Sequence, residues 1–429
     1  MAYIQRELQT KLTDIFRGPI EKGVILAGVV GCGKTTLVNE TLKELKDDFK
    51  IFVFSGDDTL FRNAIHEDTT YIFKHIRSQT NDRSLVFVDE VQKSEDIFDA
   101  VKYCFDQGNI SFIISGSNPD YLNTVAKKRL QRRADLLVLQ PFSLPEILAH
   151  RGLIGLKDTA LFRDVLVSKG TEDLGMKIDL RPEISQAVKE YVVYGGLPLA
   201  YLAQTRDEKL AEIKKVVERG FESLSVGNEN VSDAVKIELA RLNSQEFTYQ
   251  GLFQRTGVRR RDIINNTIDQ LINHGYLLKK KPYIDNGARR SYLSIFSFVD
   301  PGIVTYLTGN VDSEIDSGRK MEGIVHARID SMMKNHIQVK SSLYYFKPYT
   351  IDANDNIKFK SGELDLVFTC GTNVCPIEVK LADSLNAIKV PLLSDFVSSE
   401  KLPYGVVVYG GIPHRGKEDK LIFWPYWLV

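Results

Sequence analysis

Short apolar runs alternate with amphipathic stretches through the first 150 residues of the chain. Such alternation is typical of a parallel sheet whose strands are joined by helices. We predict strands at residues 24–27, 51–54, 85–88, 111–115 and 136–139, and helical structure within the polar stretch 57–84. Residues 1–150 are therefore expected to form an α/β domain.

The pattern changes after residue 150, where apolar positions recur at helical spacing. Residues 151–230 are expected to form a helical connector. In residues 231–310, helices at 234–242, 249–255 and 261–273 precede short strands at 276–278 and 292–295, which is the order of a winged helix. Residues 311–429 contain a helix at 318–333 and strand-like runs at 363–368, 374–380 and 404–409. The sequence thus predicts a multidomain α/β protein that ends in a second α/β domain.

A stretch between the first strand and the following helix fits the pattern G-x-x-x-x-G-K-[ST]. Its glycines let backbone N–H groups surround an anion at a helix N-terminus. Lys34 can then reach the β- and γ-phosphates of a nucleoside triphosphate, and the Thr35 hydroxyl can hold Mg²⁺. A glycine-rich turn with a surface lysine is the alternative, but the flanking strand and helix favour the phosphate site. The candidate nucleotide-binding residues are Gly28, Val29, Val30, Gly31, Cys32, Gly33, Lys34, Thr35 and Thr36.

Two carboxylates, Asp89 and Glu90, directly follow the apolar run of the third strand. An acid at this end of a buried strand can hold Mg²⁺ through water, and the next acid can activate the attacking water. We predict Asp89 as a metal residue, and Glu90 and Lys34 as catalytic residues. At the end of the fourth strand, Ser115 or Ser117 is placed to hydrogen-bond the attacking water or the γ-phosphate, which makes Ser115 a further candidate for nucleotide binding. A turn or a helix N-cap explains these serines equally well.

A cluster of cations at residues 127–133 precedes the fifth strand. An arginine there can neutralise transition-state charge in phosphoryl transfer, either in its own subunit or in a neighbouring one. Arg133 is the candidate catalytic cation, and a solvated helix face is the alternative. An action on a neighbour would require a homo-oligomer.

The C-terminal strand-like runs flank the turn sequence Gly371-Thr372. Glycine in first place suits a type II′ hairpin turn, which pairs residues whose numbers sum to 743. Asp365 then lies opposite Glu378, Glu363 lies opposite Lys380, and all four share one face. Such a face can hold a hard cation and generate hydroxide for attack on a phosphodiester. A ladder of cross-strand ion pairs is the alternative.

Basic and acidic residues both number 56, so any contact with nucleic acid requires a local patch. One patch falls on the third helix and the wing of the predicted winged helix, the parts that enter the major groove and touch phosphates in DNA-reading members. A winged helix that binds protein is the alternative. The residues are Arg259, Arg260, Arg261, Lys279, Lys280, Lys281, Arg289 and Arg290.

The start of the chain lacks a basic region followed by an apolar core, and no run of about 18 apolar residues occurs. We therefore expect a soluble, cytoplasmic protein without membrane contact. The four cysteines are widely spaced, apart from Cys370 and Cys375, which have no nearby histidine. Buried or half-buried thiols are expected rather than a zinc site.

Several motifs together resemble the bacterial and archaeal AAA-type ATPases that carry a C-terminal region of unassigned function. The chain departs from that family at Val91 for isoleucine, Ser115 for threonine and Arg132 for glycine. The resemblance covers nearly the whole chain and implies ATP and Mg²⁺ as cofactors and ATP hydrolysis as the activity. The matching residues are Tyr3, Ile4, Arg6 and Leu8, the phosphate loop, residues 88–93 and 114–117, Arg133, Pro141 to Ser143, Glu146, and residues 194–198.

The C-terminal spacing of Asp365, Glu378 and Lys380 resembles the PD-(D/E)XK nuclease core, with Glu322 matching the acid on its preceding helix. The resemblance implies a restriction-endonuclease-like domain, with Asp365, Glu378 and Lys380 in catalysis and Glu322, Asp365 and Glu378 holding Mg²⁺ or Mn²⁺. The leading hypothesis is an AAA+ ATPase coupled through a winged helix to a metal-dependent nuclease-like domain that acts on double-stranded DNA. The alternative is a signalling ATPase with a protein-binding winged helix and a silent nuclease fold.

Overall fold

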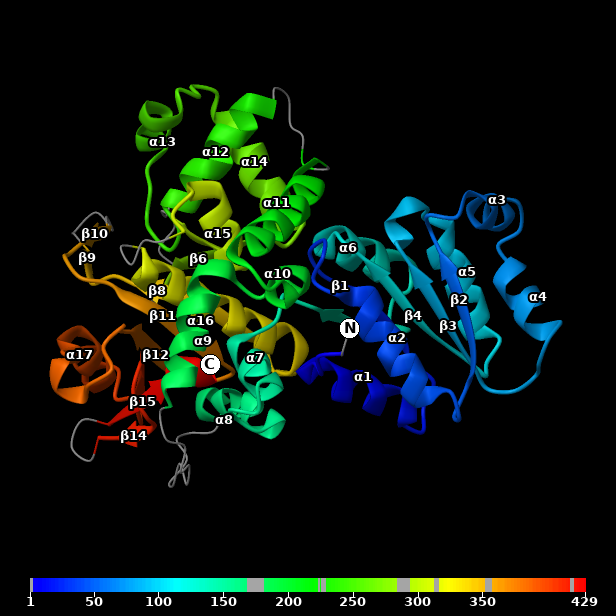
Figure 1. The fold of residues 1–429 in the computed structure, drawn as a ribbon, viewed down its shortest axis with the longest axis horizontal. Helices are drawn as coiled ribbons and strands as arrows, with labels where there is room; N and C mark the ends of the chain where they lie inside the picture. Colours follow the sequence, from blue (N-terminus) through cyan, green and yellow to red (C-terminus); the bar gives the residue numbers. More distant parts are fainter. Residues whose placement is uncertain are drawn as a thin grey trace. The chain divides into compact units, whose positions relative to one another are not determined.

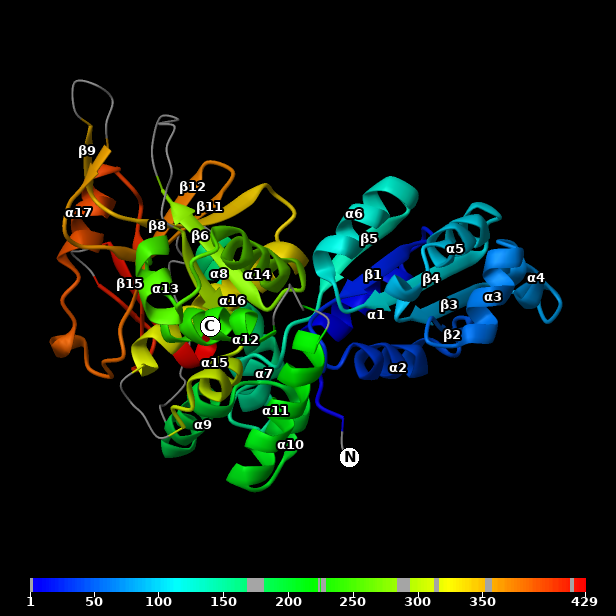
Figure 2. The same cartoon turned by 90° about the horizontal axis from the view of Figure 1, so that it is seen from above.

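The computed structural model describes residues 3–167, 181–222, 224, 229–283, 294–311, 316–351, 357–416 and 420–429 (Figure 1, Figure 2). The chain divides into two compact units. The first unit comprises Met1–Pro141 and Asn273–Tyr276, and the second comprises Phe142–Ile272 and Leu277–Val429. The phosphate loop predicted from sequence falls in the first unit, and the C-terminal carboxylates fall in the second.

The first unit is built on a parallel sheet with the strand order β2-β3-β4-β1-β5. The ends of all five strands lie within two residues of the ends predicted from sequence. Strand β4 lies between β1 and β3. Every residue of β1 and β4 is buried, as strands covered on both faces require. The strands are β1 (Gly23–Ala27), β2 (Lys50–Ser55), β3 (Ser84–Asp89), β4 (Ile110–Gly116) and β5 (Ala134–Val138).

Helices cover both faces of this sheet (Figure 2). One face packs against α3 (Thr59–Glu67), α4 (Tyr71–Arg77), α5 (Asp96–Asp106) and α6 (Pro119–Arg129), which share a buried core with alternate residues of β1, β3 and β4. Helices α1 (Glu7–Arg17) and α2 (Lys34–Leu45) lie on the other face. The first unit is therefore an α/β fold, as the alternation of its apolar runs predicted.

The second unit combines the helical segments with the C-terminal strands. The three helices predicted between residues 231 and 310 are present, and the Thr248 hydroxyl caps the second of them by accepting from the Gly251 N–H at 3.0 Å. The helices are α7 (Leu144–His150), α8 (Leu161–Val167), α9 (Pro182–Tyr194), α10 (Pro198–Leu202), α11 (Arg206–Glu222), α12 (Glu229–Arg241), α13 (Tyr249–Thr256), α14 (Arg261–Asn273), α15 (Pro301–Thr308), α16 (Ser317–Asn335) and α17 (Pro391–Ser399).

A mixed sheet of eight strands runs through the second unit in the order β14-β15-β13-β12-β11-β8-β6-β7. Strands β8, β11 and β12 form an antiparallel meander, and β13 adds in parallel beside β12 after α17. The strands are β6 (Leu277–Pro282), β7 (Ile295–Phe298), β8 (Ser341–Phe346), β11 (Leu364–Cys370), β12 (Asn373–Val379), β13 (Gly405–Tyr409), β14 (His414–Arg415) and β15 (Leu421–Pro425), with β9 (Tyr349–Ile351) and β10 (Ile357–Phe359) forming a separate pair.

The β6–β7 hairpin is not a separate wing but the edge of this sheet. Strand β6 pairs antiparallel with β7 and parallel with β8, through Lys281 beside Tyr344. The second strand of the hairpin lies three residues later than predicted. The predicted loop and the residues Arg289 and Arg290 lie outside the described part of the chain.

The predicted C-terminal hairpin register is confirmed. Leu366 pairs with Ile377 and Cys370 pairs with Asn373. In both pairs the two residue numbers sum to 743, the value predicted for a turn at Gly371-Thr372. Gly371 at the corner has a φ of +58°, which a hairpin turn of this kind needs at its first position.

Two glycines close the junction between α9 and α10 of the second unit. Gly195 has a φ of +71°, and a Cβ atom on Gly196 would lie 1.9 Å from the Phe142 carbonyl oxygen. The buried Asp300 carboxylate accepts from the Gly196 N–H at 2.7 Å and from the Gly302 N–H at 2.8 Å. Gly195 and Gly196 therefore have a structural role, because their backbone packs closely against Phe142 and Asp300.

No helix in the described residues is long and apolar enough to span a membrane. The cysteines Cys32, Cys104, Cys370 and Cys375 are buried free thiols, as predicted.

Candidate functional site

The phosphate loop connects β1 to α2 at the carboxyl edge of the first unit's sheet. Gly31 and Gly33 have φ values of +76° and +95°, which side chains other than glycine rarely adopt. A Cβ atom on Gly28 would lie 2.2 Å from the Leu139 carbonyl oxygen. The pattern glycines are therefore required by the backbone itself, whichever ligand the loop binds.

Lys34 is the first residue of α2 and is buried. Its ammonium donates to the carbonyl oxygens of Gly28 at 2.9 Å and Val29 at 3.2 Å. The loop thus holds its lysine against its own backbone, at the positive end of a helix where an anion is favoured.

A chain of hydrogen bonds links the helix start to the ends of two neighbouring strands. The Thr35 hydroxyl donates to Asp89 Oδ2 at 2.6 Å, and the Ser115 hydroxyl donates to Asp89 Oδ1. Thr35 is the second residue of α2, Asp89 ends β3 and Ser115 is near the end of β4. The parallel topology therefore brings these groups to one edge of the sheet. Hydroxyl and carboxylate oxygens are the ligands that Mg²⁺ prefers, and Thr35 and Asp89 fit such an ion.

Glu90 adopts a left-handed backbone conformation with a φ of +52°. Such conformations cost energy in residues other than glycine and cluster at functional sites. The Gln92 amide donates to the Glu90 carboxylate and, at 3.2 Å, to the Ser117 hydroxyl. Gln92 thus fixes the direction of the Glu90 side chain. The sequence motifs had not assigned a role to this glutamine.

The sequence left open whether Ser115 and Ser117 cap a helix or contact the nucleotide site. The N-terminus of α6 answers part of this question. Asn118 is the N-cap residue, since its side chain accepts from the Tyr121 N–H at 3.0 Å. Ser115 and Ser117 instead contact Asp89 and Gln92, the acidic end of β3 and its support.

Arg133 lies away from the phosphate loop of its own chain. It pairs with both carboxylate oxygens of Asp106, at 2.5 and 3.0 Å, and its carbonyl accepts from the Gly23 N–H at the start of β1. The loop follows the other end of β1, about 16 Å away at the usual rise per residue. Within one subunit Arg133 is therefore remote from the site, and an action on a neighbouring subunit stays a prediction.

Arg6 supports the loop from outside the motif. Its guanidinium is buried and donates to the carbonyl oxygens of Cys32 at 3.2 Å and Gln140 at 2.7 Å. The opening residues of the chain were noted only as part of the family resemblance, and spacing alone gave no signal for this contact.

A second polar cluster lies in the second unit, on β11, β12 and α16. Asp365 Oδ2 accepts from the Val379 N–H at 2.7 Å, and Lys380 donates to Glu378 Oε1 at 2.5 Å. The β11–β8 pairing shifts register between Leu364 and Val367, next to Asp365. Bulges of this kind re-aim side chains beside functional sites.

Burial dominates the electrostatics of this cluster. Burial and, to a smaller extent, the neighbouring Asp365 raise the pKa of Glu322 to about 8. Burial likewise raises the pKa of Glu363 and of Glu378 to about 7. Part of the acidic charge is therefore absent near neutral pH.

Lys280 belongs to this cluster, and its assignment to a DNA-contacting basic patch was wrong. Strand alternation leaves Lys279 and Lys281 exposed and turns Lys280 inward, where it is 1% exposed. Its ammonium donates to the Asp365 carbonyl oxygen at 2.9 Å. Burial lowers the pKa of Lys280, while Glu322, Asp365 and Glu363 act in the opposite direction.

The cluster does not fit the divalent metal that the nuclease resemblance implies. Among the described residues, no three histidine, cysteine, aspartate or glutamate side chains are arranged to hold a metal ion. Glu322, Asp365 and Glu378 are electrostatic neighbours, but a buried lysine already lies among them.

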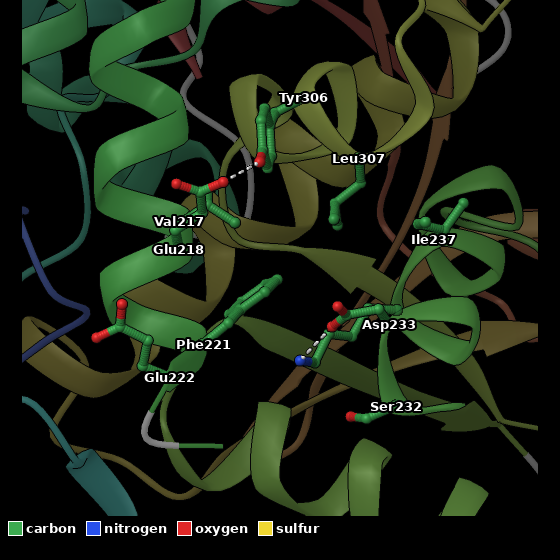
Figure 3. Close-up of a pocket in the computed structure, with 10 residues that line it drawn as sticks. Val217, Glu218, Phe221, Glu222, Ser232, Asp233, Ile237, Tyr306 and Leu307 are labelled. Carbon is green, nitrogen blue, oxygen red and sulfur yellow. Dashed lines mark hydrogen bonds and ion pairs between the residues drawn. The ribbon is translucent and has the colours of Figure 1, made fainter. Parts of the chain in front are cut away.

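A cavity of about 510 Å³ opens between α11, α12 and α15 (Figure 3). Four of its polar groups form two pairs: Tyr306 donates to Glu218 at 3.0 Å, and Lys236 pairs with Asp233 at 2.9 Å. Lys236 also lies 4.8 Å from the centre of the Phe221 ring. These pairs do not define a ligand preference.

Comparison with known families places the first unit. Residues 21–148 match the AAA domain family, a span that contains the phosphate loop, Asp89, Glu90 and Ser115. This part of the chain is therefore similar to AAA-type P-loop domains. No curated protein matches the chain.

Solved structures give weaker likenesses. The replication initiator DnaA bound to AMPPCP and single-stranded DNA is 15% identical over 63% of this chain and 90% of that chain, with a TM-score of 0.28. Cdc6p from Pyrobaculum aerophilum is 14% identical over 72% and 96%, with a TM-score of 0.26. A katanin structure is 14% identical over 62% and 82%, with a TM-score of 0.29. These TM-scores are too low to support a functional conclusion.

Proposed function

We propose that this protein is an ATP-hydrolysing AAA-type switch, starting from the AAA domain formed by residues 21–148. The observation that carries the proposal is the chain from Thr35 through Asp89 to Ser115, which gathers ligand oxygens beside the phosphate loop. Mg²⁺ held by Thr35 and Asp89 would neutralise charge on the phosphates.

The protein's own groups take the remaining roles. Lys34 leaves the carbonyls of Gly28 and Val29 and pairs with the β- and γ-phosphates. Glu90, held by Gln92, accepts the proton of the attacking water, and Ser115 keeps Asp89 in position.

Hydrolysis of ATP by the full-length protein tests this proposal. Lys34→Ala and Glu90→Gln are each expected to lower kcat by about 100-fold or more, because one removes phosphate neutralisation and the other the base. Lys43→Ala, which changes an exposed lysine of the same helix, is the matched control and should hydrolyse ATP at the parent rate. Parent-like turnover in both site variants would refute the mechanism.

We further propose that the switch acts on double-stranded DNA through the start of α14. Arg259, Arg260 and Arg261 are exposed there, and Lys279 and Lys281 are exposed on β6. This distribution supports a winged helix that contacts phosphates. Binding of protein through the same surface is the alternative.

The salt dependence of DNA binding separates these two partners. Arg259→Ala is expected to weaken binding to duplexes of any sequence and to reduce the slope of log K against log salt by about 0.9, the value for one lost phosphate contact. Lys215→Ala on α11, which also removes an exposed cation, is the control and should keep the parent slope. Equal slopes for parent and Arg259→Ala would favour the protein-binding alternative.

For the C-terminal part, we propose the silent form of the nuclease-like fold over a metal-dependent nuclease. The antiparallel meander, the register of β11 on β12 and the helix that carries Glu322 support the resemblance, whereas the buried Lys280 argues against a metal.

A further inference from the structure

The nuclease-like cluster already contains a cation supplied by the chain. Lys280 comes from β6, some 85 residues before Asp365, and reaches the cluster because β6 pairs with β8 and β8 with β11. Its side chain is buried, and its ammonium is fixed by the 2.9 Å hydrogen bond to the Asp365 carbonyl oxygen. A buried ammonium requires acidic neighbours, because desolvation strongly disfavours an isolated charge.

The acidic neighbours are present on three elements. Glu322 of α16, Asp365 of β11 and Glu363 just before β11 all act on the Lys280 charge. Glu378 of β12 interacts with Glu322 and Asp365. Lys280 therefore interacts with two of the three predicted metal ligands, Glu322 and Asp365, and hydrogen-bonds the backbone of the second.

The carboxylate oxygens are also partly used by protein donors. Asp365 Oδ2 accepts from the Val379 N–H, and Glu378 Oε1 accepts from Lys380. Glu378 Oε2 is buried and, among the described residues, has no hydrogen-bond partner. Mg²⁺ demands near-ideal octahedral oxygen ligation, and the described residues provide no group of three such side chains.

We propose that the Lys280 ammonium is the resident cation of the Glu322–Asp365–Glu378 cluster and takes the place of a divalent metal. In this arrangement Lys280 joins β6 to β11 and α16 electrostatically. The cluster is then a structural centre, and the catalytic roles predicted for Asp365, Glu378 and Lys380 are not exercised.

Mn²⁺ binding to the nucleotide-free, full-length protein tests this proposal. We expect no Mn²⁺ binding that depends on Asp365 in the parent. Lys280→Met keeps the apolar stem but removes the charge, so it should gain an Mn²⁺ site about ten-fold tighter or more, within the range by which neighbouring groups tune metal sites. The gain should disappear in Lys280→Met/Asp365→Asn. Lys281→Met, one position along the strand and exposed, is the matched control and should gain nothing.

Three results would overturn the proposal. One is Mn²⁺ binding by the parent that Asp365→Asn abolishes. Another is Mn²⁺-dependent cleavage of double-stranded DNA by the parent that Asp365→Asn abolishes. The third is a folded Lys280→Met protein without the new site.

A second variant covers the case in which Lys280→Met does not fold. Lys280→Met/Glu322→Gln removes the ammonium together with one of the acids that act on it and should recover a melting temperature close to that of the parent. Failure to recover folding would show that Lys280 does not balance this acid. None of these measurements depends on ATP turnover, so failure here is distinguishable from failure of the ATPase proposal.

Discussion

At the scale of single residues, several positions are held by backbone contacts that no motif describes. Arg6 binds the phosphate-loop carbonyl of Cys32, Gln92 holds Glu90, and Asp300 binds the N–H groups of Gly196 and Gly302. Arg6 and Cys32 are 26 positions apart, and Asp300 and Gly196 are 104 positions apart, so these two contacts follow from the fold and were not accessible from local spacing. Gln92 is only two residues from Glu90, and its role depends on how the turn after β3 directs both side chains.

Asp300 offers a test of this kind of contact. Asp300→Asn places an amide N–H group against a backbone donor, so we expect the second unit to lose about 1–3 kcal/mol of stability. Chemical denaturation monitored for the second unit measures the loss. Asp395→Asn on α17 serves as a control for the general effect of the exchange.

The size of that loss should depend on pH. Burial raises the pKa of Asp300 to about 6 from an ordinary value of 3.8, so the folded protein keeps this proton longer than the unfolded chain does. The contribution of Asp300 to stability is therefore fully present below about pH 4 and declines as the pH rises to about 6. The difference between parent and Asp300→Asn should be larger at about pH 4.5 than at about pH 7.5. A difference that grows with pH would contradict this assignment.

At the scale of elements, the start of α7 shows how local signals define a helix. The Ser143 hydroxyl accepts from the Glu146 N–H at 3.3 Å, and the Glu146 carboxylate accepts from the Ser143 N–H at 2.9 Å. Pro145 lies in the first turn, where its missing N–H group is tolerated. The proline and the reciprocal cap together define the start of this helix.

Ser143→Ala tests the cap. It removes the side-chain acceptor, so we expect a loss of about 1 kcal/mol in the free energy of unfolding. Ser143→Asp retains an acceptor and should lose less. Equal losses in both variants, measured by denaturant unfolding, would mean that the hydroxyl is not the stabilising group.

At the scale of the whole molecule, much of the architecture follows from the order of apolar and polar residues. The five strands of the first sheet, the helices of the second unit and the register at Gly371 all depend on neighbours close in sequence. The pairing of β6 with β8 does not, because it joins residues more than 60 positions apart. In the sequence, Lys279-Lys280-Lys281 looks like one basic patch. In the structure, the pairing of β6 with β8 places the side chain of Lys280 in the acidic cluster and leaves the other two lysines exposed.

The candidate sites show the same division. Lys34, Thr35, Asp89 and Ser115 were identified because a phosphate loop and the ends of parallel strands obey local rules. Arg133 was proposed from its place in a motif. Its ion pair with Asp106 could not be predicted, because that pair depends on how α5 packs beside the start of β5.

Strand β6 also bears on how such a protein can change over generations. It is at once half of the β6–β7 hairpin, a member of the C-terminal sheet and the carrier of Lys280. A gene rearrangement that replaced residues 231–310 as a cassette would therefore remove a strand and a buried charge from the neighbouring segment. Inheritance should accordingly keep residues 277–429 together.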